Sequence, residues 1–287
     1  MTAESSAPLF RGWRAVRTDD GSYTLAHPTH GETCHSVAGA WQESWERYAV
    51  STGLPDVARG TRVALLDVGT GLGLNLAAAL AALEGCTLVA VSLEHDEGVL
   101  RAALELGAWL RASGDDARLP APLARWHPVV LAAIERALAT NAARVPLAGG
   151  ELELRIGDAR ATLRELALDQ RFDAVFFDPF SRTKEPALWA LDVLADVAAR
   201  MAPNARLATY SASLEVRARL VAGGLHVGPL ARVGSKAQGT IAVRADGATD
   251  AAPPFDPRTR RRLERRVARL QSPGGNSHSS VGLGTGD

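Results

Sequence analysis

The chain has 287 residues with 32 basic and 32 acidic side chains, so its formal net charge is zero at pH 7. This balance excludes an overall field that would draw the whole chain to nucleic acid or to a membrane. With only two cysteines, we do not expect a disulfide framework. No apolar run reaches about 18 residues, so we do not expect a membrane span. The first residues have no secretory signal pattern, so we expect a cytoplasmic protein.

Residues 9–55 are predicted to form a small N-terminal extension. Short strands are expected over Ser22–Ala26 and Glu32–His35, on either side of a turn that contains proline and glycine. A helix should run from about Ser36 to Thr52, where the following Gly-Leu-Pro sequence ends it.

In residues 56–246, strand-like and helix-like segments alternate. Strands are expected over 62–68, 87–93, 151–156, 172–177, 206–210, 225–230 and 239–244. Helices are expected over 72–83, 96–112, 120–143 with a break near Pro128, 186–201 and 213–222, with a short helix between the third and fourth strands. This alternation predicts right-handed crossovers and a doubly wound, seven-stranded, mostly parallel α/β sheet of Rossmann-like type. No helix separates the last two strands, so they should form an antiparallel hairpin.

Residues 247–287 are predicted to form a linker, a basic helix and a disordered end. Asp256-Pro257 is typical of a helix start, and Leu263, Val267 and Leu270 form an apolar stripe at helical spacing. Residues 255–271 contain seven arginines and two acids. Such a helix could contact RNA phosphates, or it could simply be a solvated surface helix. The last 15 or so residues have the Gly/Ser-rich composition of a disordered segment.

A glycine-rich turn follows the first strand of the predicted sheet. It reads Asp67-Val-Gly69-Thr-Gly71-Leu-Gly73 and leads into a helix, as in nucleotide-binding turns. Glu94 ends the second strand, where an acid can accept hydrogen bonds from ribose hydroxyls. A dinucleotide would also fit these features, and Glu94 could be a solvated strand-end acid. The G-x-G-x-G spacing favours S-adenosylmethionine, which has no phosphate to place at a helix N-terminus.

Two further acids follow the third and fourth strands. Asp158 could accept the adenine amino group, or it could be the N-cap of a helix that begins near Arg160. Asp178 ends a buried strand at the edge where ligands bind in open parallel sheets. Methyl transfer to an amine requires an acceptor that has lost or redirected its proton, so Asp178 is the candidate catalytic group. Its alternative role is to cap the turn before Pro179.

Four segments of the chain resemble the methyltransferase that completes 5-methylaminomethyl-2-thiouridine in tRNA, which is the N-terminal half of MnmC or the stand-alone MnmD. The glycine-rich turn continues as Gly-Leu-Asn75, similar to the family's G-F-G-T-G-L-N. The most specific segment is Asp178-Pro-Phe-Ser-Arg-Thr-Lys184-Glu-Pro-Ala-Leu-Trp189. The others cover residues 18–25 with 31–36 and 39–44, and residues 208–211 to 234–236. Thr70, Leu72, Arg182 and Glu185 depart from the family's usual residues.

The resemblance implies a class I methyltransferase that transfers a methyl group from S-adenosyl-L-methionine to the aminomethyl nitrogen of a wobble uridine in tRNA. It also implies that Asn75 and Glu43 lie at the donor site. Substrate contacts would come from Lys184, Phe180, Trp189 and Lys236. We expect no metal, no membrane partner and no flavin domain. The alternatives are a small-molecule N-methyltransferase, an enzyme similar to aminopropyltransferases, and a non-enzymatic RNA-binding module.

Overall fold

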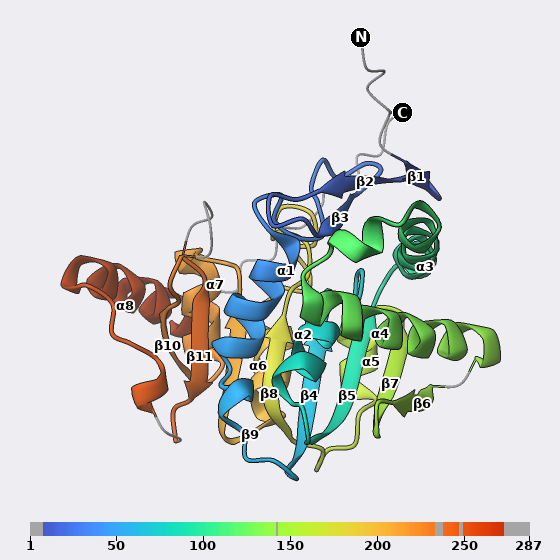
Figure 1. Ribbon diagram of the computed structural model, residues 1–287. Helices are drawn as coiled ribbons and strands as arrows, with labels where there is room; N and C mark the ends of the chain where they lie inside the picture. The colour runs from blue at the N-terminus through green and yellow to red at the C-terminus, as the bar shows by residue number, and fades with distance from the viewer. Residues whose placement is uncertain (1–7, 142, 233–237, 247–248, 273–287) are drawn as a thin grey trace, which may run out of the picture.

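A computed structural model describes residues 8–141, 143–232, 238–246 and 249–272 of the chain. Its centre is an eight-stranded sheet (Figure 1). In spatial order the strands are β10 (Leu225–Pro229), β11 (Thr240–Arg244), β9 (Met201–Thr209), β8 (Phe172–Phe177), β4 (Arg62–Val68), β5 (Thr87–Glu94), β7 (Gly150–Ile156) and β6 (Arg144–Leu147). β11 runs antiparallel to both of its neighbours and β6 runs antiparallel to β7, whereas the other pairs are parallel.

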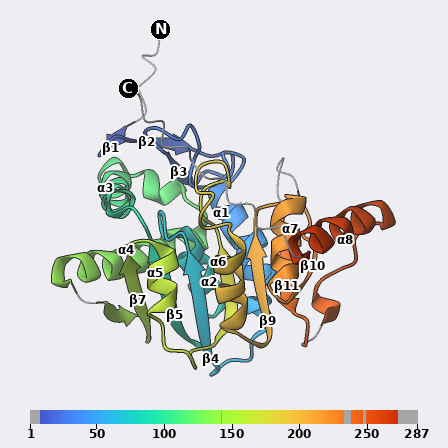
Figure 2. The ribbon, with the colours of Figure 1, turned by 180° about the vertical axis from the view of Figure 1, so that it is seen from behind.

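Helices cover both faces of this sheet, which makes the predicted doubly wound arrangement (Figures 1 and 2). One face carries the π-helix η1 (Glu43–Val50), α2 (Leu74–Ala82), α3 (Glu97–Ser113) and α4 (Ala121–Thr140). The other face carries α5 (Ala159–Arg164), α6 (Leu191–Ala199), α7 (Leu214–Ala222) and α8 (Pro257–Gln271). Each face has its own cluster of buried apolar residues. The central strand β4 contributes Leu65 to one cluster and Leu66 to the other, because successive side chains of a strand point to opposite faces.

A second, three-stranded sheet sits over the carboxyl ends of the central strands, at the top of Figure 1. It consists of β1 (Leu9–Phe10), β2 (Trp13–Arg17) and β3 (Tyr23–Ala26), all antiparallel. Trp13 and Leu25 are buried and belong to the same apolar cluster as α2 and α4. The short helix α1 (Ala40–Gln42) then leads into η1. The N-terminal segment is therefore held to the rest of the protein by a shared core.

The structure differs from the sequence-based expectation at β6, which is an eighth strand of the sheet. A two-residue turn joins β6 to β7, and both turn residues have positive φ, 47° at Ala148 and 85° at Gly149. Such turns match the twist of a β-hairpin. The alternation of Arg144–Leu147 is too short to distinguish from the end of a helix by its pattern alone. Pro146 is tolerated because β6 is at the edge of the sheet.

Four other segments also differ from the prediction. α4 continues through Pro128 without a break, because packing of its buried face against α2 and α3 outweighs the one hydrogen bond that proline cannot make. Residues 32–35 form only a single bridge, between Thr33 and Ala26, instead of a strand. α6 begins at Leu191 instead of residue 186, and β9 already begins at Met201. The remaining elements of the described chain are three short 3-10 helices, η2 (Leu54–Asp56), η3 (Asp115–Arg118) and η4 (Thr249–Ala251).

Among the described residues, no helix has both the length and the apolar character needed to cross a membrane.

We expect Gly73→Ala to lower the free energy of unfolding by about 2–4 kcal/mol, combining backbone strain with overpacking. Gly73 has a φ of +76°, and a Cβ there would lie 2.7 Å from Cγ1 of Val130 in α4. The matched control is Gly114→Ala, because Gly114 has nearly the same φ of +74° but no atom within 4 Å of the added Cβ. Urea denaturation of both variants isolates the helix–helix contact. Equal losses of stability in the two variants would mean that α4 moves to accommodate the new Cβ with no further loss in the free energy of unfolding.

Candidate active site

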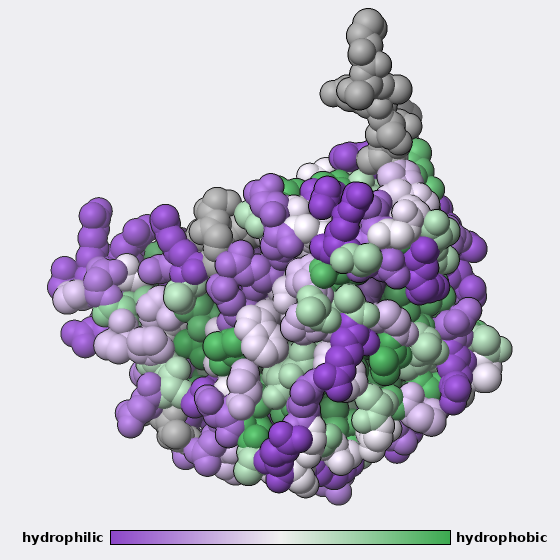
Figure 3. All heavy atoms as spheres, viewed as in Figure 1, coloured by the Kyte–Doolittle hydropathy of each residue, from purple (hydrophilic) through white to green (hydrophobic). Residues whose placement is uncertain are grey.

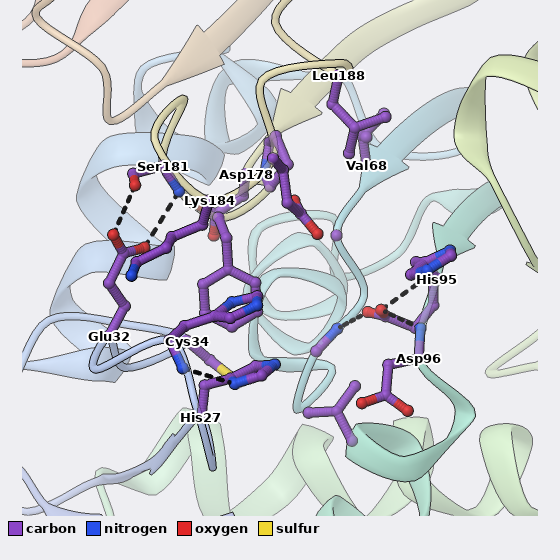
Figure 4. A pocket seen from close by; sticks show the side chains of 18 of the residues that line it. His27, Glu32, Cys34, Val68, His95, Asp96, Asp178, Ser181, Lys184 and Leu188 are labelled. Atoms are coloured by element: carbon purple, nitrogen blue, oxygen red, sulfur yellow. Dashed lines mark hydrogen bonds between the residues drawn. The ribbon is translucent and has the colours of Figure 1, made fainter. Parts of the chain in front are cut away.

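A cavity of about 1010 Å³ opens where the carboxyl ends of β4, β5, β7 and β8 meet the N-terminal segment. Figure 4 shows Asp178 and Lys184, from the chain after β8, facing His27 and Cys34 of the N-terminal segment across it. Among the described residues, two permanently cationic side chains line the cavity, Arg160 and Lys184, against seven carboxylates. The carboxylates belong to Glu32, Glu43, Glu94, Asp96, Asp158, Asp178 and Glu185. This charge imbalance favours a cationic ligand and disfavours phosphate inside the cavity.

The glycine-rich turn between β4 and α2 forms the floor of the cavity with its backbone. Gly69 has a φ of +93°, and a Cβ there would lie 2.6 Å from the carbonyl oxygen of Asp178. Gly71 has a φ of +51°, and an added Cβ would meet only Cys34, at 3.9 Å. A side chain at Gly71 would therefore occupy cavity space that the glycine leaves free. Gly73 does not line the cavity, since it packs against α4.

Glu94 ends β5 and lines the cavity beside this turn. Its Oε2 accepts a hydrogen bond from the backbone N–H of Gly71 at 2.8 Å, and its Oε1 accepts from those of His95 and Asp96. A carboxylate oxygen can accept two hydrogen bonds, so Oε2 keeps capacity for one more donor. Burial raises the pKa of Glu94, although the three backbone donors oppose this effect. Glu94 therefore holds the turn in shape and also offers an acceptor to a ligand.

Asp178 is held at the end of β8 by side chains from three other segments. The Tyr48 hydroxyl, from η1, donates to Oδ1, and Nδ2 of Asn75, from α2, donates to Oδ2 at 2.9 Å. Nε2 of His35 lies 3.8 Å from Oδ2. The Asp178 side chain is 7% exposed and lines the cavity. These donors fix the orientation of the carboxylate and stabilise its ionised form. Burial and the neighbouring Asp178 raise the pKa of Tyr48 well above its usual value, so its hydroxyl keeps its proton.

Asp67 and Asn75, both predicted at the donor site, lie beneath the cavity and do not line it. Asp67 is fully buried, and its Oδ2 accepts from the Ser92 hydroxyl at 2.6 Å. Burial raises the pKa of Asp67 to about 8, against the lowering effect of the Ser92 hydrogen bond. Asn75 reaches the site only through Asp178. Both residues are therefore placed to support the turn and the carboxylate from below.

Asp158 lines the cavity, and it is also the N-cap of α5. Its Oδ1 accepts from the backbone N–H of Arg160, and the Arg160 guanidinium binds both carboxylate oxygens. These hydrogen bonds lower the pKa of Asp158. Both roles proposed from the sequence are thus geometrically available to the same carboxylate, and its contact with adenine stays a prediction.

Of the residues suggested by the family resemblance, some line the cavity and others do not. Glu43 lines the cavity; it accepts from the Ser36 backbone N–H at 2.7 Å and pairs with the buried Arg47. Phe180 and Lys184 also line the cavity. Trp189 is buried outside it, with Nε1 donating to the carbonyl oxygen of Phe180, so its effect on a substrate would be indirect. Lys236 lies outside the described residues.

Several residues of the site are not identifiable from the sequence alone. Tyr48 and His35 contact Asp178, and Tyr210 lines the cavity, where its hydroxyl donates to the Pro179 carbonyl oxygen at 3.1 Å. Glu32 accepts from the Ser181 hydroxyl and backbone N–H, which ties the N-terminal segment to the chain after β8 (Figure 4). Glu32, His35 and Tyr210 lie in segments that resemble the family, and Tyr48 lies in none of them. No local pattern gives these four side chains a role, because they reach the site from distant parts of the chain. Within the described ranges, no group of three His, Cys, Asp or Glu side chains could hold a metal ion.

Residues 123–245 match a family model described as S-adenosyl-L-methionine-dependent methyltransferase. The doubly wound fold, the glycine-rich turn at the end of β4 and the acidic side chains at the ends of β5 and β8 agree with that class. Together they define the protein as a methyltransferase that uses S-adenosyl-L-methionine.

The sequence is 34% identical over 231 residues to the tRNA 5-methylaminomethyl-2-thiouridine biosynthesis bifunctional protein MnmC of Azoarcus sp.. The alignment covers 77% of this chain and 34% of that protein. The structure is similar to MNMC2 from Aquifex aeolicus, with a TM-score of 0.65 and 27% identity over 90% of this chain and 78% of that one. Over about three quarters of its length the chain is therefore similar to MnmC, and its fold is similar to that of MNMC2.

The chain spans between 34% and 64% of the length of the first curated relatives it matches. Spermidine synthase from Thermotoga maritima shares the fold, with a TM-score of 0.51, but only 14% of its residues are identical.

The described residues fit the methyl donor. Gly71 leaves room for a ligand against the turn, Glu94 keeps a free acceptor position, and the acidic lining suits a sulfonium cation. Gly69, Gly71 and Glu94 would hold the nucleoside part, with Asp158 at its far end. Glu43 also lines the cavity and would face the positively charged part of the donor.

The buried Asp67 predicts a pH dependence of stability. Its carboxyl keeps a proton in the folded protein up to a pKa of about 8, whereas in the unfolded chain it ionises near pH 4. The folded state therefore binds more protons between these values, and the free energy of unfolding should fall as the pH rises from 5 to 8. Asp67→Asn should fall less steeply, while the exposed control Asp169→Asn should follow the wild type. Urea denaturation at several pH values tests this, and parallel curves for wild type and Asp67→Asn would contradict it.

Glu94→Ala should weaken the binding of S-adenosylhomocysteine by about 1–3 kcal/mol, the magnitude expected for an unsatisfied polar partner. Since Glu94 also holds the turn, calorimetry should compare 5′-methylthioadenosine with its 2′,3′-dideoxy form. The wild type should prefer the form with ribose hydroxyls, and Glu94→Ala should lose that preference. If the variant keeps the same preference, Glu94 supports the turn and does not bind ribose.

Proposed function

We propose that this protein methylates the aminomethyl nitrogen of 5-aminomethyl-2-thiouridine at the wobble position of tRNA in the cytoplasm. The observation that carries the proposal is the buried Asp178 carboxylate, held by Tyr48 and Asn75 in an acidic cavity beside the glycine-rich turn. An alkylamine is mostly protonated at neutral pH. A fixed carboxylate in such a cavity can bind this cation and accept the proton that the nitrogen must lose before its lone pair can attack the methyl group.

S-adenosyl-L-methionine supplies an electrophilic methyl group, so no proton has to be removed from the carbon that is transferred. The residues of this chain then have two tasks. The turn at Gly69 and Gly71 and the Glu94 carboxylate bind the donor in one orientation. Asp178 binds and orients the amine, so that its lone pair points toward the donor. The contact between Gly69 and the backbone of Asp178 fixes the separation between the donor floor and this carboxylate.

Two observations support tRNA as the substrate. One is the similarity to MnmC, and the other is an exposed lysine at the opening of the cavity, which we call its mouth. The name of the Azoarcus relative describes the biosynthesis of 5-methylaminomethyl-2-thiouridine in tRNA. Lys184 is exposed at the mouth and is one of only two lysines among 32 basic residues, the other being Lys236. We assign Lys184 to a phosphate or base edge of the RNA, and Phe180 to the nucleobase.

A free small amine is the second candidate acceptor. The same acidic lining and volume would suit a small cationic substrate. Glu185, which departs from the family's usual residue, lines the cavity, and Arg182 departs from it three positions earlier in the sequence. Mass spectrometry of wobble nucleosides from a deletion strain tests the choice. Accumulation of 5-aminomethyl-2-thiouridine supports tRNA as the substrate. Unchanged nucleosides, together with methylation of small amines by the purified protein, would favour the second candidate.

Asp178→Asn should lower the single-turnover rate of methylation of undermodified tRNA by roughly 10²–10⁴, the usual contribution of one acid–base group. The side-chain oxygen can still accept from Asn75, and the Tyr48 hydroxyl can rotate to accept from the new amide, so the local geometry should be kept. Affinity for S-adenosylhomocysteine should change little. Raising the pH should restore part of the rate, because more of the amine is then unprotonated.

The control is Tyr48→Phe, which removes one hydrogen bond to Asp178 but keeps its charge. Its rate should fall less than that of Asp178→Asn, and it should not be restored by raising the pH. A near wild-type rate for Asp178→Asn at neutral pH would show that Asp178 is structural. Loss of S-adenosylhomocysteine binding in the same variant would place Asp178 in the donor site.

A further inference from the structure

The cavity leaves one requirement of an RNA substrate unmet. In the part of the lining that the structure describes, seven carboxylates face two permanently cationic side chains, and this lining repels the phosphates of any nucleic acid that delivers a base into the cavity. Neutralising phosphates normally supplies most of the affinity for nucleic acid, apart from sequence recognition. A basic surface outside the cavity, but on the same side of the molecule, is therefore needed.

The helix α8 presents such a surface. Arg258, Arg261, Arg262, Arg265 and Arg269 are all exposed, and their spacing of i, i+3, i+4, i+7 and i+11 places them on one face of the helix. The buried or partly buried Leu263, Val267 and Leu270 lie on the opposite face. Among the described residues, Arg261, Arg262, Arg265 and Arg269 have no ion-pair partner. At 1.5 Å per residue this arginine face is about 16 Å long.

The protein holds α8 rigidly. Asp256 caps the helix by accepting from the backbone N–H groups of Arg258 and Thr259 at 3.0 Å. The apolar face packs on α7, and Arg266 pairs with Glu215 in the first turn of α7. Just before α8, the Phe255 ring lies 4.5 Å from the guanidinium carbon of Arg217. The arginine face is thus pre-organised, and no ordering of the helix is needed on binding.

The contacts that anchor α8 also place it toward the carboxyl end of the sheet, where the cavity opens. Glu215 follows Tyr210, which lines the cavity, by five residues. Arg217 donates to the Thr240 hydroxyl at 2.9 Å, and Thr240 pairs with Thr209 at the carboxyl end of β9. Figures 1 and 2 show α8 alongside α7 at one flank of the sheet, and Figure 3 shows hydrophilic residues over this flank.

We propose that the arginine face of α8 binds the phosphate backbone of the RNA substrate while its target base enters the acidic cavity. This rests on the proposed function, in that the substrate is an RNA. An anionic membrane is the other polyanion to consider, but a membrane-surface helix inserts its apolar face, and the apolar face of α8 is already buried against α7. The residues 123–245 that match the methyltransferase family do not include α8, so this surface is an addition to the matched region.

The test is the triple variant Arg261→Gln, Arg265→Gln and Arg269→Gln in the full chain. Glutamine has a similar helix propensity and leaves the apolar face intact. The matched control, Arg59→Gln, Arg62→Gln and Arg136→Gln, removes the same charge from exposed arginines away from α8. Arg62 begins β4, Arg59 lies three residues before it, and Arg136 is in α4. Circular dichroism checks folding. Fluorescence anisotropy measures binding of undermodified tRNA between 50 and 300 mM salt, a range over which the Debye length shortens and phosphate charges are increasingly screened.

The α8 variant should bind tRNA about 10- to 100-fold more weakly near physiological salt, with a salt slope lower by about 2–3, as expected for three lost phosphate contacts. The control should keep the wild-type slope. Affinity for S-adenosylhomocysteine should be unchanged in both. Equal slopes for the wild type and the α8 variant would overturn the inference, as would an effect of the variant on binding to phosphatidylserine vesicles without one on tRNA.

The outcomes for α8 and for the proposed function can be separated. If the wild type methylates tRNA and the α8 variant binds tRNA normally, the inference fails while the function stands. If the wild type methylates only small amines, but tRNA binding still depends on α8, the proposed acceptor is wrong and the RNA surface stands. If the wild type does not bind tRNA at any salt concentration, both are overturned.

Discussion

Gly69 and Asp178 meet where β4 and β8 end, and the active site is built around this close approach. The carbonyl of Asp178 occupies the position that a side chain at residue 69 would need, and the Asp178 backbone N–H donates to the Val68 carbonyl oxygen at 2.9 Å. The floor of the donor site and the proposed catalytic carboxylate are therefore parts of one rigid junction. For methyl transfer this matters more than any single contact, because the reaction depends on holding two groups in line.

Buried acids surround this junction, and each is stabilised in a different way. Asp178 is ringed by hydrogen-bond donors, Glu94 is bound by three backbone N–H groups, and Asp67 has one hydroxyl and a pKa raised to about 8. Burying a charged carboxylate is unfavourable unless donors or cations compensate for it. A protonated Asp67 avoids this penalty beneath the cavity, while Glu94 and Asp178 carry the acceptor groups at its surface.

The molecule separates its charges in space although its net charge is zero. The acidic residues of the cavity suit a sulfonium donor and an amine acceptor, and the arginines of α8 suit phosphates. A single basic surface that included the cavity would attract RNA but would repel both reacting cations. The composition, with 32 acidic and 32 basic residues, gives no indication of this separation, because it records totals and not positions.

The sequence by itself determined the alternation of strands and helices, the glycine-rich turn, the strand-end positions of Glu94 and Asp178, and the amphipathic character of α8. These follow from local patterns, because hydrophobic periodicity, glycine spacing and capping residues act over a few neighbouring positions. It did not separate Gly73, which packs on α4, from Gly71, which lines the cavity, because both belong to one motif.

Only the tertiary structure decided which side chains surround Asp178 and that Asn75 and Asp67 lie beneath the cavity. It also decided that β6 joins the sheet as an eighth strand and that α4 continues through Pro128. The pairing of Tyr48 with Asp178 spans 130 positions of the sequence. Such contacts depend on the packing of η1 and α2 against the sheet, and no local pattern in the chain encodes them.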